Sequence, residues 1–135
     1  MVVVKGAENV TSVFFDAEGL AVSKVEFVRA DAMGPIYTWH DVEFKVSRPN
    51  NNLGDAIEVI LPHGCSAGFE FKLRLYYVTN EKSTAINWLK PSQTAGKKLP
   101  YMYTHCEDIA CRSVAPLQDT PANKLTYSAM ITVRN

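Results

Sequence analysis

The side chains best suited to chemistry lie together in one short stretch: His105, Cys106, Glu107, Asp108 and Cys111. A structural zinc site needs four ligands, and its Cys or His ligands usually come in pairs about two to four residues apart. Here Cys106 and Cys111 are separated by four residues, and no second pair exists, because His40 and His63 stand alone. We therefore expect no metal ion to be bound by this chain.

A cysteine nucleophile activated by a histidine is the next chemistry to consider. Neighbouring residues of an extended strand point to opposite faces, so His105 is badly placed to take a proton from Cys106. We interpret Cys106 and Cys111 as two small buried thiols. Together with Cys65 they form no disulfide framework, and all three cysteines are expected to be free. This cysteine usage is typical of a reducing compartment and predicts a cytoplasmic protein. A small enzyme built on Cys106 stays an alternative, and fast thiol alkylation at neutral pH would support it.

The two carboxylates of this stretch are also adjacent, which argues against a general acid–base pair made of Glu107 and Asp108. No catalytic residue is predicted in the chain. A carboxylate in an irregular, aromatic-rich connection is suited to bind a cation such as a ligand amine. A solvated or helix-capping role is the simpler alternative.

Composition excludes several kinds of partner. The chain has 135 residues, 14 Lys plus Arg and 14 Asp plus Glu, so its formal net charge is zero. A neutral chain without a basic cluster is not expected to bind nucleic acid or an anionic membrane surface. No apolar run approaches the roughly 20 residues of a membrane span, and we expect no signal peptide. With 47% hydrophobic residues, one domain with an ordinary core is predicted.

Period-two alternation of apolar and polar residues dominates the chain, and this pattern predicts strands. The clearest strand covers residues 69–77, where Phe71, Leu73 and Leu75 share one face. Strands are expected at residues 1–4, 13–15, 24–27, 42–46, 57–61, 69–77 and 125–133. Short strands at this spacing are typical of an antiparallel sandwich or a curved open sheet.

Turn residues separate these strands, at Glu18-Gly19, Met33-Gly34-Pro35, Pro49–Asp55 and Pro62-His63-Gly64. The alternation fades between Trp88 and Pro121. This stretch is too apolar for disorder, so we expect a packed, shaped connection of the kind that often carries binding residues. Asp119-Thr120-Pro121 within it predicts a turn in which the aspartate accepts local backbone N–H groups.

Several segments of this stretch resemble the M1-family zinc aminopeptidases of the leukotriene A4 hydrolase type. The resemblance is carried by Ile86–Lys98, Pro100–Cys106, Cys111-Arg112, Pro116–Pro121 and Lys124–Ala129. These segments follow one another in register over about residues 84 to 133, far more than a single short motif. Residues 1–4 and 13–25 are similar more weakly, so the resemblance covers nearly the whole chain.

The resemblance implies a fold and an activity. The family's N-terminal domain is mainly β, a saddle-shaped, sandwich-like antiparallel sheet. It packs on a catalytic domain that holds zinc through a His-Glu-x-x-His helix and a further glutamate, which this chain lacks. Residues 1–135 are thus expected to be a single, incomplete N-terminal domain. Its partner would be the catalytic domain of a longer polypeptide that removes N-terminal residues from peptides, with epoxide hydrolysis as a second activity.

The resemblance also implies a substrate site. In the family, a segment of this domain offers Gln or Glu side chains to the free amino end of the substrate. The matching positions are His105 and Glu107, with Asp108 in place of a small residue. Glu107 has the acidic form that pairs with an ammonium group. A free-standing β-sandwich module that binds peptides or proteins is the alternative, and it would have complete, sealed sheet edges.

Overall fold

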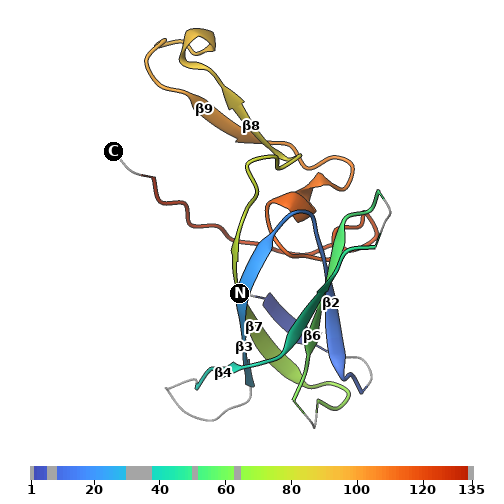
Figure 1. Ribbon diagram of the computed structural model, residues 1–135. Helices are drawn as coiled ribbons and strands as arrows, with labels where there is room; N and C mark the ends of the chain where they lie inside the picture. The colour runs from blue at the N-terminus through green and yellow to red at the C-terminus, as the bar shows by residue number, and fades with distance from the viewer. Residues whose placement is uncertain (1, 6–8, 30–37, 50–51, 63–64, 134–135) are drawn as a thin grey trace.

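The computed structural model describes residues 2–5, 9–29, 38–49, 52–62 and 65–133. Within these ranges two antiparallel sheets pack against each other, and a two-stranded hairpin projects away from them (Figure 1). The first sheet has the order β1-β7-β3-β4, formed by Val2–Lys5, Glu70–Val78, Ala21–Arg29 and His40–Asp41. The second has the order β2-β6-β5, formed by Ser12–Ala17, Asp55–Ile60 and Phe44–Ser47.

The core lies between the two sheets because the apolar face of each alternating strand turns inward. Phe71 and Leu73 of β7 are fully buried, as are Ile57 and Val59 of β6. The rings of Phe27 and Phe71 lie 5.5 Å apart across β3 and β7, a distance typical of favourable aromatic pairs. The mainly β, antiparallel, sandwich-like fold expected from the alternation is confirmed.

One turn brings two strands unusually close. Gly54 has a φ of +89°, and a Cβ atom there would lie 2.5 Å from the backbone oxygen of Ala17. Only glycine fits such a position without displacing β2. The turn predicted at Glu18-Gly19 is also present, whereas those at Met33–Pro35 and His63-Gly64 lie outside the described residues, as do residues 50 and 51.

The stretch from Trp88 to Pro121 is more ordered than expected. It contains a hairpin of β8 (Ile86–Leu89) and β9 (Tyr101–Thr104), joined through the 3₁₀ turn η1 (Pro91–Gln93). A second 3₁₀ turn, η2 (Ala110–Ser113), packs on the end of β2. The expectation of a packed connection holds for η2 but not for the hairpin, whose strand β9 is exposed throughout.

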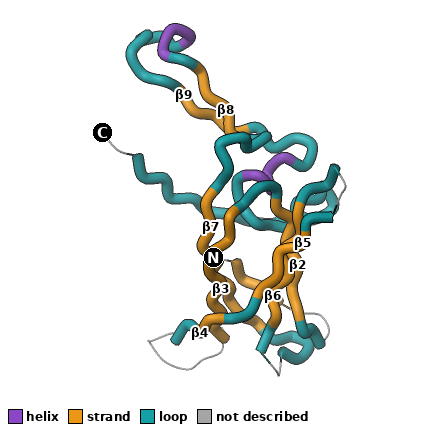
Figure 2. Tube along the Cα trace, viewed as in Figure 1, coloured by secondary structure: helices purple, strands orange, loops and turns teal. Residues whose placement is uncertain are grey.

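The strand expected at residues 125–133 is wrong. This segment is extended but has no strand partner among the described residues, and its side chains are exposed. Figure 2 shows it as loop, leaving the body of the sandwich. Alternation is a local property of the sequence, whereas a strand also needs a neighbouring edge to pair with. In the described part of the chain, no edge strand pairs with this segment.

Candidate functional site

The predicted site residues His105, Glu107 and Asp108 lie on an exposed segment between β9 and η2, residues 105–109, called here the site segment. The side chains of His105 and Glu107 are 63% and 80% exposed, and His105 Nε2 lies 3.9 Å from Glu107 Oε2. Asp108 is exposed too, and no ion pair or hydrogen bond joins it to another described residue. The fold therefore brings two of the three predicted site residues together.

Both ends of the site segment are held by backbone hydrogen bonds. The His105 N–H donates to the Ala85 carbonyl at 2.9 Å, which joins the segment to the chain entering β8. At the other end the Ala110 N–H donates to the Cys106 carbonyl at 3.0 Å. Glu107 thus lies on a short loop whose two ends are held in place, and loops positioned in this way often carry binding residues.

Arg112 fixes η2 to the sandwich. Its side chain is only 8% exposed, and its Nε lies 3.2 Å from Asp119 Oδ2. The guanidinium also donates to the carbonyl oxygens of Asp119 and Leu53, while the Arg112 carbonyl accepts the Glu18 N–H. Asp16 Oδ1 lies 3.8 Å from Arg112 Nη1. A buried charge with this many partners ties η2 to β2, to the 52–54 turn and to Asp119.

Ser113 forms a second anchor at the base of the hairpin. The residue is fully buried, and its Oγ lies 2.8 Å from Ser83 Oγ and accepts the Ala85 N–H at 3.1 Å. It also donates to the Ala110 carbonyl at 2.8 Å. Thr84 Oγ1 lies 2.9 Å from Glu18 Oε2 and 3.2 Å from Ser113 Oγ, so hydroxyl groups connect the start of the hairpin to η2 and to the turn after β2.

Cys106 and Cys111 form a disulfide, with 4.5 Å between their Cα atoms. The interpretation of all three cysteines as free thiols is therefore wrong for this pair. The chain turns between them instead of continuing as a strand, and this brings their Cβ atoms together. A sulfur in a disulfide is no nucleophile, so the structure does not support an enzyme built on Cys106.

Cys65 is the cysteine for which the earlier interpretation holds. It is buried and free, and burial raises the pKa of its thiol. A thiol with a raised pKa stays protonated at neutral pH and is unreactive. Cys65 packs with the apolar core as a small hydrophobic residue.

Among the described residues, no three His, Cys, Asp or Glu side chains gather closely enough to hold a metal ion. His40 lies exposed at the start of β4, away from the site segment, and His63 lies outside the described residues. No helix in the described ranges is long and apolar enough to cross a membrane.

The residues that anchor the site were missed by sequence reasoning. No sequence pattern marked Arg112 and Ser113 as buried anchors, because their burial depends on segments far away in the chain. Asp119 was expected to accept local backbone N–H groups, but its carboxylate accepts hydrogen bonds from the backbone N–H and the Nε of Arg112. A lone arginine in an apolar, irregular stretch, followed by an aspartate seven residues later, was the signal available.

The described fold is an antiparallel β domain that presents an exposed polar segment. The family model described as the peptidase M1 N-terminal domain matches residues 1–135. The chain therefore belongs to the peptidase M1 N-terminal domain family.

Relatives give the same assignment. The chain is 35% identical to leukotriene A-4 hydrolase of Xenopus laevis over 126 residues, which are 93% of this chain and 19% of that protein. It is 41% identical to aminopeptidase B of Rattus norvegicus over 87 residues, 64% of this chain and 13% of the relative. The chain thus spans less than a fifth of the length of these relatives.

Solved structures agree on the fold. The structure of native yeast leukotriene A4 hydrolase superposes with a TM-score of 0.65 at 28% identity, covering 85% of this chain and 16% of that one. The complex of the yeast enzyme with bestatin gives a TM-score of 0.62 at 27% identity, over 82% of this chain and 16% of the other.

Proposed function

We infer that this chain is the substrate-anchoring N-terminal domain of a zinc aminopeptidase, in which Glu107 binds the free α-ammonium group of a peptide. The observation that carries this inference is an exposed carboxylate on a segment fixed at both ends, in a chain that belongs to the peptidase M1 N-terminal family. His105 lies beside Glu107 and Asp108 follows it, and both would shape the recognition of the first residue.

An exposed carboxylate binds an ammonium group weakly by itself, because water screens both charges. Glu107 is 80% exposed in this chain. Tight binding requires a second surface that removes water from the pair, and the proposed source of that surface is the catalytic domain of the longer polypeptide. The zinc ion would also be held there, since the described residues of this chain do not fit a metal, and it would supply an activated water.

The free-standing binding module is less well supported. Such a module needs closed edges and covered apolar surface. Here Trp88, Tyr101 and residues 125–133 expose apolar side chains, which is the condition of a unit made to pack against something else.

The decisive experiment is Glu107→Gln in the full-length polypeptide. The substitution keeps the side-chain shape and removes the charge. kcat/KM for aminoacyl-arylamide substrates should fall. The expected loss of transition-state stabilisation is about 2–4 kcal/mol, the scale for losing one partner of a desolvated charge pair.

The matched control is Glu81→Gln, at an exposed glutamate of the turn after β7. This variant should keep the parent value. An unchanged kcat/KM for Glu107→Gln contradicts a charge pair between Glu107 and the substrate ammonium, and an equal loss in both variants shows that the effect is not specific to Glu107.

A further inference from the structure

The hairpin of β8 and β9 is apolar on both of its faces. Directly opposed residues of an antiparallel pair share a face. Trp88 opposes Met102 on one face, and Leu89 opposes Tyr101 on the other, where Tyr103 also lies. Trp88 is 63% exposed, Tyr101 59% and Tyr103 42%. Figure 1 shows the hairpin extending away from the sandwich, so neither face is covered by the two sheets.

A hairpin of two strands is at best marginally stable in water when nothing covers it. Strands that are apolar on both faces are normally covered on both. An exposed apolar surface of this kind marks a contact with another molecule or domain. The two-sided pattern therefore points to insertion into a groove, since docking on a flat surface would cover only one face.

The hairpin is shaped before it meets a partner. Its tip is closed by its own polar groups, because the Lys90 N–H donates to Gln93 Oε1 at 3.0 Å and Thr94 Oγ1 donates to the Leu99 carbonyl at 3.1 Å. Its base is held by Ser113 and by the hydrogen bond from His105 to Ala85. A preorganised element loses little conformational entropy when it docks.

Charge narrows the choice of partner. The hairpin, residues 86–104, carries Lys90, Lys97 and Lys98 and no aspartate or glutamate. A complementary surface is an apolar groove with acidic residues at its rim. The partner that carries this groove must also be a polypeptide that the relatives possess. The region matched here is 19% of the Xenopus relative, so more than four-fifths of that relative lies outside it.

We propose that the β8–β9 hairpin inserts between two walls of an apolar, acid-rimmed groove on the remainder of the same polypeptide. This inference rests on the proposed function, in which the chain is one domain of a longer peptidase. It adds a task for the hairpin: Thr104 ends β9 and leads directly into His105, so the docked hairpin sets the position of Glu107. Contact of the groove with both faces of the hairpin would then align the Glu107 carboxylate with the substrate.

Hydroxyl-radical footprinting tests the insertion by comparing the full-length polypeptide with the chain of residues 1–135. Trp88 and Met102 report one face, and Tyr101 and Tyr103 report the other. All four should be labelled at least about five-fold more slowly in the full-length protein, as expected for the dry centre of an interface. Tyr76 on the outer face of the first sheet is the internal reference and should change less than about two-fold.

Protection of one face only would overturn insertion, and protection of neither would overturn docking altogether. Protection that appears only after anionic vesicles or single-stranded nucleic acid are added would overturn the choice of partner. If the hairpin is protected but the full-length protein cleaves no aminoacyl-arylamide, the peptidase function fails while the docking stands. If Glu107→Gln lowers turnover but the hairpin stays fully labelled, the docking alone fails.

A pair of charge reversals supplies the matched variants. Lys97→Glu with Lys98→Glu places negative charge against the acidic rim and should raise the labelling of Tyr101 and Tyr103 in the full-length protein about three-fold or more. Lys45→Glu with Lys82→Glu changes the same charge on exposed positions of the sandwich and should leave this labelling as it was. Equal labelling in both double variants contradicts the acidic rim.

Discussion

At the scale of single residues, Arg112 decides how the site segment is held. It lies in an irregular stretch, yet its guanidinium is buried and paired with Asp119 while three separate segments meet around it. Such a charge is costly to bury and is tolerated only when its hydrogen bonds are complete. The position of Glu107 therefore depends on an arginine that never needs to touch a substrate.

Arg112→Met tests this dependence. The substitution keeps much of the length of the side chain but leaves Asp119 without its partner, so the free energy of unfolding should fall by about 3–5 kcal/mol. Urea denaturation of the chain measures the change. Arg48→Met is the control, because Arg48 is 74% exposed and lies 3.9 Å from Asp55. It should cost less than about 0.5 kcal/mol. Similar losses in both variants would show that Arg112 is not a special anchor.

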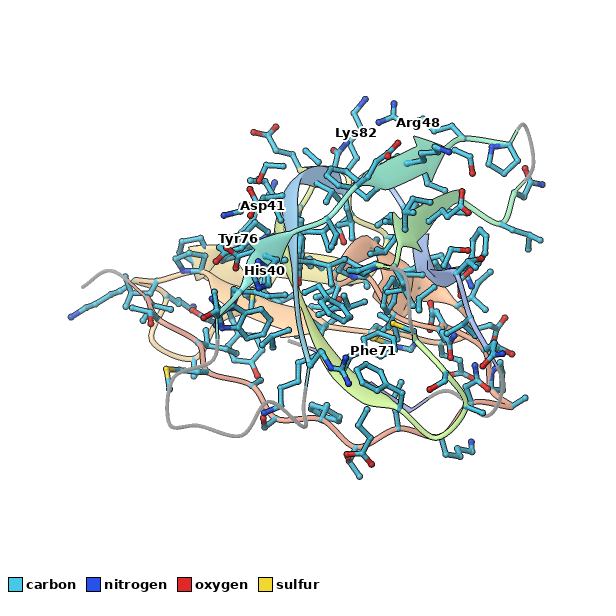
Figure 3. The ribbon with its side chains drawn as sticks, turned by 90° about the horizontal axis from the view of Figure 1, so that it is seen from below. His40, Asp41, Arg48, Phe71, Tyr76 and Lys82 are labelled. Atoms are coloured by element: carbon cyan, nitrogen blue, oxygen red, sulfur yellow. A yellow bond between two sulfur atoms is a disulfide. The ribbon has the colours of Figure 1, made fainter. Side chains whose placement is uncertain are left out.

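At the scale of elements, the outer face of the first sheet is held by a polar network across three strands. Glu26 of β3 accepts hydrogen bonds from Arg74 and Tyr76 of β7, and Lys24 lies 2.7 Å from it. Lys24 also lies 3.0 Å from Asp41 of β4. Figure 3 shows Asp41 and Tyr76 gathered in this region. Alternation alone predicts a solvated glutamate here, but these neighbours bury it.

This network makes the sheet sensitive to acid. The hydrogen bond from Lys24, with help from Tyr76 and Arg74, lowers the pKa of the Glu26 carboxyl. A group whose pKa is lower in the folded state stabilises the fold above its unfolded pKa, about 4.3, and this contribution is lost as the pH falls through the folded pKa.

Glu26→Gln should therefore lower the midpoint of thermal unfolding at pH 7, and the difference from the parent chain should shrink as the pH falls below about 4. Thermal melts across this pH range measure the trend. Glu43→Gln, at an exposed glutamate between β4 and β5, provides the comparison. If the difference in unfolding midpoint between Glu26→Gln and the parent chain stays constant with pH, the Glu26 network is not the cause of acid sensitivity.

At the scale of the whole molecule, the chain consists of a packed sandwich and of segments that extend away from it. The sandwich has its own core, whereas most side chains of the hairpin, the site segment and residues 122–133 are exposed or partly exposed. Figure 1 shows the hairpin and the C-terminal segment leaving the body of the sandwich. Surface left open in this way is typical of a domain that is completed by another. This distribution supports a domain that positions a substrate for chemistry carried out elsewhere.

The isolated chain should accordingly show no turnover of aminoacyl-arylamides when zinc is added, because no cluster of metal ligands exists among its described residues. A chromogenic assay with and without zinc measures this. The full-length polypeptide, assayed beside it, is the positive control. Turnover by the isolated chain that a chelator abolishes would contradict the division of labour proposed here.

The sequence by itself determined most of the strands and their buried faces, because alternation with a period of two is a local property that needs no knowledge of the partner strand. Residues 69–77 illustrate this, since Phe71 and Leu73 are buried as their spacing predicts. It also carried the family, through segments that run nearly the whole length of the chain.

Only the tertiary structure decided which strands are neighbours, that Cys106 pairs with Cys111, and that Arg112 is buried. It also showed that residues 125–133, which alternate as well as any strand, pair with no strand in the described part of the chain. Each of these outcomes depends on groups that are far apart in sequence. Contacts of this kind are set by how the sheets pack in three dimensions, and local pattern carries no record of them.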